Sequence, residues 1–255
     1  MLSFNRLRAA GAAAGIHFFC SLAVAFLAGI LVFGLWYPFP YRELSGGREL
    51  FLLVVTVDVV CGPLLTMVLF NPAKPRAELW RDLSWVILIQ LAALGYGLFN
   101  VWQARPLFLV LEIDRFKVVT APSLESKAID ELPDTLRPKW WSGPKIVAIR
   151  LPKDNAESDK VMFEAVQGGR DFAERPEFYL PYDEVSAQKS LNKAKPLSLF
   201  LQRWPSQKVA ATNLVLDQKL DNAQLRYLPV IGRQDWVAVL DQQGKIRGYL
   251  KGDGF

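Results

Sequence analysis

A single carboxylate lies in the middle of a long apolar run, and its chemistry needs an explanation more than that of any other residue in this sequence. The run covers residues 50–70 and contains TVDVVCGPLLTMV, in which Asp58 is followed by Gly62 and Pro63. On a helix Asp58, Gly62 and Thr66 share one stripe, because they are spaced four residues apart. Pro63 has no N–H to donate, so we expect a kinked helix with a free carbonyl close to Asp58.

Asp58 needs either a partner or a proton, because insertion scales assign a central aspartate a cost of about 2.5–3.5 kcal/mol in a bilayer. Depth along the predicted helices, at about 1.5 Å per residue, places Gln90 and Tyr96 near Asp58 and His17 too far away. A hydrogen bond from Gln90 or Tyr96 would give Asp58 a bundle-organising role. The alternative is a polar contact with the membrane helix of another protein. One carboxylate and one histidine at different depths do not make a conducting path, which argues against transport.

The rest of the sequence holds no recognisable catalytic or metal-binding pattern. Its only histidine is His17, and its two cysteines, Cys20 and Cys61, lie in apolar runs. The aspartates of DRF (Asp114) and DQQG (Asp241) are better explained as turn and strand-end residues. We therefore expect no enzyme, no metal, no cofactor and no small-molecule substrate. The net charge of +5 is spread along the chain, so we also expect no nucleic-acid partner.

Three apolar runs, each about the 20 residues that a transmembrane helix needs, predict the module that would hold Asp58. They cover residues 15–37, 50–70 and 83–102 of the 255-residue chain. The first run is longer than the apolar region of a signal peptide, and no small-residue cleavage site follows it, so we expect it to be retained. Small residues spaced four apart predict helix–helix packing seams. They are Ser21, Ala25 and Gly29 in the first run and Ala93 and Gly97 in the third.

Basic residues near the helix ends predict the orientation of these helices. The N-terminal tail and the second loop, residues 71–81, together carry five Lys and Arg residues, and the first loop, residues 38–49, carries two. We therefore expect a multi-pass protein of the cell inner membrane, with its N-terminus and second loop in the cytoplasm. The C-terminal domain would then lie in the periplasm.

The distribution of charge marks the boundary of this second part. Of the 30 Lys and Arg residues 23 lie after residue 103, together with 20 of the 25 Asp and Glu residues. A charged segment of this length suits one globular domain with its own core. We therefore predict a three-helix transmembrane module over residues 1–104 and a periplasmic α+β domain over residues 105–255.

Apolar patterning and turn residues predict the elements of this domain. A helix should begin at the N-cap Asp154, with Glu157 in the capping-box position, and end at the glycine pair 168–169. Residues 184–204 indicate a helix broken at Pro196. The strand candidates are residues 107–119, 145–151, 225–232, 235–241 and 245–250, the last two joined as a hairpin. The expected fold class is α+β with a small antiparallel sheet, beside the α-helical membrane module.

Two adjacent tryptophans form the one exposed-looking apolar feature of the domain. Trp140 and Trp141 lie in RPKWWSGPK, within a segment rich in Pro, Ser and charged residues. They belong either to the core or to an exposed patch that contacts a membrane or a partner. The sequence leaves both interpretations open.

Several short motifs, in their order and spacing, resemble those of a known family. They are WYP at residues 36–38, D-x-x-x-GP-L at residues 58–64, QLAALGYG at residues 90–97, and RP followed by a strand and DRF at residues 105–116. This pattern resembles the TfpX/TfpZ-type accessory proteins of type IV pilins. The resemblance covers about residues 15–120, whereas the second half of the chain shares only length, domain placement and a closing D-x-x-G hairpin.

The resemblance implies an inner-membrane accessory protein of Gram-negative bacteria, chaperone-like or modulating, that assists the assembly of a cognate pilin into type IV pili. The partners it implies are membrane lipid and the major pilin, through the pilin's membrane helix and globular head. The family supplies no catalytic or binding residues to transfer. The alternative is a membrane-bound enzyme that acts on pilin or envelope substrates through Asp58 or an exported carboxylate. A sensory role is disfavoured, since the predicted cytoplasmic parts are short.

Overall fold

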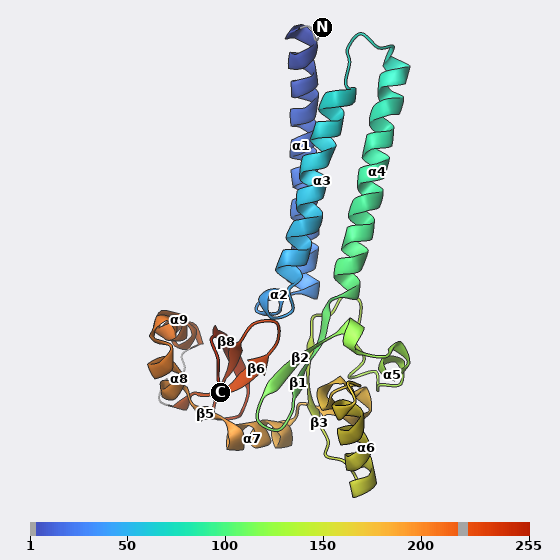
Figure 1. Cartoon of the computed structure of the whole chain (residues 1–255). Coiled ribbons are helices and arrows are strands. Elements are labelled where there is room, and N and C mark those ends of the chain that lie inside the picture. The colour runs from blue at the N-terminus through green and yellow to red at the C-terminus, as the bar shows by residue number, and fades with distance from the viewer. Residues whose placement is uncertain (1–3, 219–223) are drawn as a thin grey trace. The chain divides into compact units, whose positions relative to one another are not determined.

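The computed structural model describes residues 4–218 and 224–255, which fold as two compact units (Figure 1). The first, here called the helical unit, contains the described residues up to Trp36 and Gly47–Gln103. The second, the sheet domain, contains Tyr37–Gly46 and Ala104–Phe255. The predicted division at residue 104 assigns the first loop to the helices, whereas residues 37–46 fold with the sheet domain.

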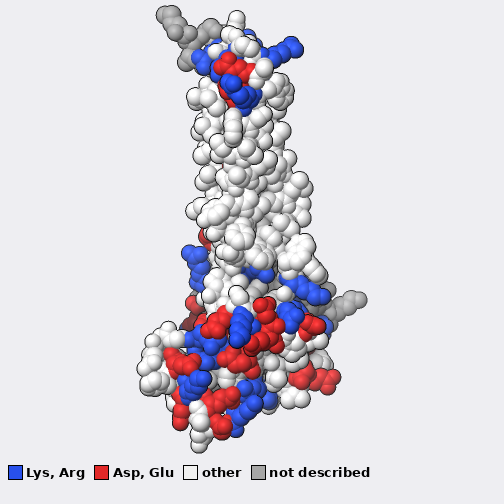
Figure 2. Space-filling view, turned by 90° about the vertical axis from the view of Figure 1, so that its right-hand side faces the viewer, with Lys and Arg blue, Asp and Glu red and all other residues white. Residues whose placement is uncertain are grey.

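Three helices make up the helical unit, and each is long and apolar enough to cross a membrane. They are α1 (Phe4–Leu31), which continues as the π-helix η1 (Val32–Trp36), α3 (Gly47–Leu69) and α4 (Arg76–Gln103). All three begin before the predicted apolar runs, because a helix can continue through residues of other types. Their C-terminal ends, with η1 counted as part of α1, lie within one residue of the predicted ends. Figure 2 shows that the visible face of this unit is free of charged side chains between its two ends.

The central helix α3 packs against both α1 and α4. The predicted seam on α1 is confirmed, since Ser21 and Ala25 are buried and Gly29 would place a Cβ 3.5 Å from the ring of Phe51. On α4 only half of the predicted seam is correct. Gly97 lies against Val54 of α3, but Ala93 is exposed, because the buried stripe follows other positions. These positions are Val86, Gln90, Leu94 and Val101.

One sheet of eight strands forms the second unit, in the order β4-β3-β1-β2-β6-β7-β8, with β5 paired to β6. The strands are β1 (Pro106–Leu111), β2 (Phe116–Thr120), β3 (Lys145–Ile149), β4 (Tyr179–Pro181), β5 (Lys195–Pro196), β6 (Arg226–Ile231), β7 (Trp236–Leu240) and β8 (Ile246–Lys251). The sheet is therefore larger than expected and mixed: five of its pairings are antiparallel, as predicted, and two are not. The pairs β1–β3 and β2–β6 are parallel, because long connections return the chain in the same direction before it pairs.

The predicted strand over residues 107–119 is a hairpin of β1 and β2. Its turn is closed by a hydrogen bond from the backbone N–H of Glu112 to the carbonyl of Arg115, 2.9 Å long. Asp114 lies in this turn and accepts a hydrogen bond from the Arg115 side chain. The sequence did not indicate this turn, because β1 is a continuous apolar run without the alternation of a half-buried strand.

Both faces of the sheet are buried, which explains the unbroken apolar runs. In β1 the side chains of Leu109 and Leu111 enter one hydrophobic cluster, while Phe108 and Val110 enter another on the opposite face. Strand β7 alternates in the same way between two clusters. Burial on two faces is typical of strands that read as continuous hydrophobic sequence. Successive side chains still alternate between the two faces, but both sets are apolar, so the sequence shows no alternation of polar and apolar residues.

Short helices lie around the sheet of this domain (Figure 1). They are α2 (Tyr41–Leu44), α5 (Ser126–Asp130), α6 (Asn155–Val166), α7 (Glu184–Lys193), α8 (Leu197–Arg203) and α9 (Lys208–Gln218). Short 3-10 helices are η2 (Ala121–Ser123), η3 (Phe172–Glu174), η4 (Pro176–Phe178) and η5 (Pro205–Gln207). The predicted break at Pro196 is present, since α7 ends before β5 and α8 follows it.

The predicted ends of α6 are confirmed in most respects. Asp154 accepts a hydrogen bond from the backbone N–H of Glu157, 2.8 Å away, and Gly168 leaves the helix with a φ of 79°. The Glu157 carboxylate, however, accepts from the N–H of Lys153 and not from the N-cap residue. It is also held by both terminal nitrogens of Arg150, at 2.8 and 2.9 Å.

The first loop contributes to the core of the sheet domain. Tyr41 and Leu44 of α2 are buried in the cluster that also contains residues of β1, β2, β6 and β7. The Tyr41 hydroxyl lies 3.3 Å from that of Tyr249, and the Leu44 carbonyl accepts from the N–H of Arg233. A Cβ on Gly232 would lie 2.6 Å from the Leu44 carbonyl oxygen. Part of the core of the sheet domain therefore comes from the loop that joins α1 to α3.

Leu44→Ala tests this contribution. Because Leu44 is only 1% exposed, its truncation should lower the free energy of unfolding of the sheet domain by about 2–5 kcal/mol. Urea unfolding of the full-length protein in detergent, followed by near-ultraviolet circular dichroism, measures this change. Leu151→Ala is the matched control, since Leu151 is exposed and should change the free energy by less than about 0.5 kcal/mol. Equal effects of the two substitutions would show that the first loop is not part of this core.

The Glu157–Arg150 pair predicts a pH dependence. Hydrogen bonds from the Arg150 guanidinium, and then from the Lys153 N–H, lower the pKa of Glu157 to about 2. A lowered folded-state pKa stabilises the fold above the ordinary carboxyl pKa, and this stability is lost as pH falls towards 2. Glu157→Gln should therefore flatten the loss of unfolding free energy between about pH 5 and pH 2. Parallel acid slopes for Glu157→Gln and wild type would contradict the assignment.

Candidate partner-binding site

Asp58 lies in the middle of α3, eleven residues from each end of the helix, and its residue surface is only 8% exposed. The Gln90 side chain reaches it from the middle of α4. The amide nitrogen Nε2 of Gln90 donates to the Asp58 carboxylate oxygen Oδ1, 3.2 Å away, and to the Asp58 backbone carbonyl, 2.9 Å away. The hydrogen bond predicted from Gln90 to Asp58 is therefore present.

Tyr96, the other predicted partner, does not reach Asp58. Its residue surface is 71% exposed, and its backbone carbonyl accepts a hydrogen bond from the Asn100 side chain. Tyr96 and Gln90 are six residues apart, so their side chains point about 120° apart around α4. Depth along α4 placed both residues near Asp58. Rotation around α4 shows that only Gln90 points towards it.

Gly62 and Pro63 shape the backbone at the point where the Gln90 amide arrives. A Cβ on Gly62 would lie 2.1 Å from Nε2 and 2.2 Å from Oε1 of Gln90. Any larger residue at position 62 therefore displaces the amide from Asp58. Pro63 lies inside α3 and supplies no N–H to the carbonyl four residues before it. The glycine makes room for the amide, and the proline weakens the helical bonding next to it.

The predicted stripe of Asp58, Gly62 and Thr66 is buried along its whole length. Thr66 uses its hydroxyl for a contact with His17 of α1, where Oγ1 and Nδ1 lie 2.5 Å apart. Thr66 is eight residues from Asp58, about 12 Å along the helix, so His17 is indeed a separate contact. The position of Thr66 on the Asp58 stripe was the sequence signal for this second polar pair.

A groove of about 680 Å³ runs along this face of α3, between α1 and α4. Its floor carries the polar side chains of Asp58, Thr66, Gln90 and His17, and we call it the α3 groove. Its walls are mainly apolar. They include Ile16, Cys20, Val24, Leu83, Ile87 and Leu91, and Phe70 and Arg76 line the groove near the second loop.

The chemistry that the α3 groove offers is hydrogen-bond acceptance in apolar surroundings. The second amide atom of Gln90, Oε1, is buried and accepts no hydrogen bond from any residue within 4–218 or 224–255. Among these residues there is also no group of three His, Cys, Asp or Glu side chains placed to hold a metal ion. Both cysteines are free thiols, one in the groove wall (Cys20) and one outside it (Cys61).

The sheet domain exposes the two tryptophans that the sequence left between core and surface. Trp140 is 58% exposed and Trp141 is 51% exposed, so neither belongs to a core. Their rings meet edge to face with centroids 5.3 Å apart, and the Lys139 amine lies 5.5 Å from the centre of the Trp141 ring. Three hydrogen bonds between Lys139 and Ser142 close the turn that presents both rings.

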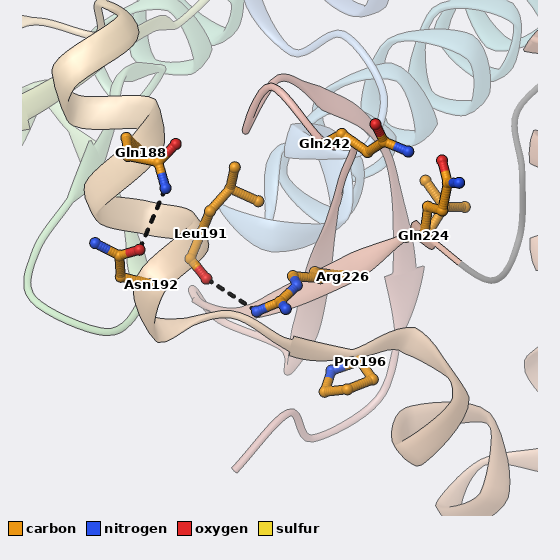
Figure 3. Close-up of a pocket in the computed structure, with 8 residues that line it drawn as sticks. Gln188, Leu191, Asn192, Pro196, Gln224, Arg226 and Gln242 are labelled. Carbon is orange, nitrogen blue, oxygen red and sulfur yellow. Dashed lines mark hydrogen bonds between the residues drawn. The ribbon is translucent and has the colours of Figure 1, made fainter.

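A second hollow, of about 660 Å³, lies where α7, β5 and the start of β6 meet (Figure 3). Amide side chains surround it, from Gln188 and Asn192 of α7, from Gln224 and from Gln242. The cation among its described lining residues, Arg226, donates to the carbonyls of Leu191 and Ala194, which end α7. Such a surface can bind polar backbone or hydroxyl groups, but its strongest donor already serves the helix end.

The predicted turn roles of Asp114 and Asp241 agree with their contacts. Asp241 Oδ1 accepts from the backbone N–H groups of Gln243 and Lys245, and Oδ2 accepts from Arg247 at 2.6 Å. Gly244 completes this hairpin with a φ of 74°. The carboxylate therefore fixes the turn between β7 and β8.

A double-mutant cycle tests the role of Gly62. Gln90→Ala and Gly62→Ala should each lower the free energy of unfolding of the helical unit by about 0.5–2 kcal/mol, because each removes the amide from Asp58. In the Gln90→Ala background, Gly62→Ala should cost less than about 0.5 kcal/mol, since no amide is left to displace. Sodium dodecyl sulfate titration of the full-length protein, followed by circular dichroism, measures both.

The control for this cycle is Gly95→Ala on α4, where an added Cβ meets nothing within 4 Å. It should leave the unfolding free energy unchanged. A cost of Gly62→Ala that is the same with and without Gln90 would contradict the contact between the two residues.

Comparison with known proteins identifies relatives over most of the chain. A family profile described as "Fimbrial assembly protein FimB" matches residues 5–46. The chain is 36% identical to "Fimbrial assembly protein, serogroup I" of Dichelobacter nodosus, over 94% of each protein, and 34% identical to the serogroup E1 protein over the same shares. It is 45% identical over 119 residues to the protein of serogroups C1 and C2, covering 47% of this chain and 88% of that protein.

No solved structure matches the chain. The family assignment therefore stands on sequence identity, which extends through both the helical unit and the sheet domain. The expected role in pilus assembly agrees with the names of these relatives. By its similarity over nearly its whole length, the chain belongs to the fimbrial assembly protein family.

Proposed function

We propose that this protein assists the assembly of type IV pili by binding a pilin subunit at a membrane, and that it acts by binding and not by catalysis. The observation that carries the proposal is the α3 groove, in which a buried hydrogen-bonding pair lies among apolar helices. Family membership supports the assembly role. The narrower description, an accessory protein of the TfpX/TfpZ type, rests on the motifs at residues 36–38, 58–64 and 90–97.

Each unit offers the pilin a surface of different chemistry. The helical unit offers the α3 groove, which suits a hydrophobic membrane helix. The sheet domain offers the exposed pair Trp140 and Trp141, and large aromatic side chains often dominate protein–protein binding energy. We propose that the tryptophans contact the pilin's globular head.

The contacts of the carboxylates favour a role in binding over catalysis. In the sheet domain Asp241 orders a hairpin, Asp183 accepts from the N–H of Ser186 as an N-cap, and Glu157 is held by Arg150. Helix capping lowers the pKa of Asp183, which keeps it ionised and unsuited to general acid chemistry near neutral pH. In the helical unit Asp58 is hydrogen-bonded to Gln90.

The charge asymmetry of the loops supports a topology. We propose that the three helices of the helical unit span the inner membrane with the second loop in the cytoplasm, as the positive-inside rule predicts. The sheet domain then lies in the periplasm, where it meets the part of a pilin that lies outside the membrane. The absence of cysteine after residue 61 means that this domain relies on its hydrophobic clusters for stability.

Deletion of the gene tests the proposed function. Cells without the protein should carry fewer surface pili by electron microscopy, while immunoblots show unchanged pilin in the membrane fraction, because pilin synthesis does not need a binding partner. Re-expression of the wild-type chain should restore pili. If pilus number, length and retraction are all unaffected by the deletion, an assembly role is wrong.

A further inference from the structure

We infer that the α3 groove binds the hydrophobic membrane helix of the pilin, and that this helix presents a hydrogen-bond donor at the depth of Asp58 and Gln90. The identity of the partner rests on the proposed function, whereas the location and the donor follow from the groove itself. The donor is a side-chain hydroxyl, amide or amine, or a backbone N–H near the end of the helix.

The side-chain oxygen of Gln90 is a hydrogen-bond acceptor without a donor among the described residues. Gln90 is 9% exposed, spends both hydrogen bonds of its Nε2 on Asp58, and leaves Oε1 buried without a donor among the described residues. A buried acceptor without a partner is destabilising, because it has lost the hydrogen bonds that water would supply. Asp58 adds a carboxylate that receives only one side-chain hydrogen bond in the described structure. Asp58 and Gln90 both line the groove, so a donor on a ligand there would meet a hydrogen-bond acceptor in apolar surroundings.

The groove is long enough to receive several turns of a helix. From Asp58 to Phe70 its floor follows twelve residues of α3, about 18 Å at 1.5 Å per residue. This distance is a little over three turns of a helix and more than half of the hydrocarbon thickness. A helix that lies along α3 would therefore contact apolar walls over several turns and meet the polar pair at the Asp58 end of the groove.

The composition of the groove favours a helix over a lipid acyl chain. A lipid acyl chain can fill an apolar groove, but it has no donor for Gln90 or Asp58. Helices associate in lipid through close packing and interhelical hydrogen bonds. The α3 groove offers both, since α1 and α4 each pack on α3 and line the groove on its two sides.

Site-specific photocrosslinking in cells that assemble pili tests the inference. A photoreactive benzoylphenylalanine replaces either Ile87, which lines the groove, or Ile89, which is exposed on α4 outside it. The full-length protein should crosslink to pilin from position 87 and not from position 89. Immunoblots with antibodies to pilin and to this chain identify the product.

Groove-filling substitutions give a matched control that leaves the polar pair intact. Ala13 lines the groove, whereas its neighbour Ala12 is exposed outside it. Ala13→Trp should abolish the crosslink from position 87, and Ala12→Trp should leave it unchanged at equal protein level. Asp58→Leu should abolish the crosslink as well, while Asp58→Asn, which retains an acceptor, should preserve most of it.

The outcomes separate the inference from the proposed function. Pilin crosslinks from position 89 or from Trp140, with none from position 87, would overturn the groove assignment and leave the pilin-binding role standing. Crosslinks from position 87 only to lipid or to a second copy of this chain would also overturn it. If a deletion has no effect on pili but position 87 still captures pilin, the assembly role fails while the groove assignment holds.

Discussion

The helical unit depends on one hydrogen-bonded pair that is buried among apolar side chains. Asp58 and Gln90 lie near the middles of α3 and α4, and the amide of Gln90 reaches both the side chain and the backbone of Asp58. Gly62 is required by this geometry, because a side chain there would occupy the space of the amide. A polar pair in apolar surroundings specifies register strongly, since a slip of one residue would leave both groups unsatisfied.

The same pair accounts for the α3 groove. With Gln90 drawn onto α3 on one side and His17 on Thr66 on the other, the floor between α1 and α4 stays polar while the walls stay apolar. A groove of this composition selects by chemistry as well as by shape. Apolar length gives contact area, and the acceptors discriminate against a helix without a donor at the right depth.

The sheet domain follows a different principle, because its stability comes from strands buried on two faces. The clusters on the two sides of β1 and β7 take alternate side chains of the same strands. Tyr41 and Leu44 join one of these clusters from the loop between α1 and α3. The folding of this domain therefore requires a segment that precedes it in sequence by two long helices.

The sequence predicts features that depend on composition and short-range spacing. It locates the three long helices, the stripe of Asp58, Gly62 and Thr66, the hydrogen bond from Gln90 and the N-cap Asp154, because each follows from periodicity or local chemistry. Depth along a helix does not fix rotation around it, and this is why Tyr96 was placed wrongly. The spacing of small residues does not say which stripe of α4 faces α3, and this is why Ala93 was placed wrongly. A strand buried on two faces shows no alternation, so the β1–β2 turn and the parallel pairings were missed. The contact between residues 37–46 and the sheet domain is long-range, and no local signal predicts it.

The two native cysteines allow a direct test of whether the α3 groove receives a pilin helix. Cys20 lies in the groove wall and Cys61 lies outside it, and both are free thiols. The rates at which N-ethylmaleimide alkylates each thiol in the detergent-solubilised full-length protein can be followed by mass spectrometry, with and without purified pilin. We predict that pilin slows alkylation of Cys20 and leaves that of Cys61 unchanged. Unchanged rates at both cysteines, or equal slowing at both, would contradict the account.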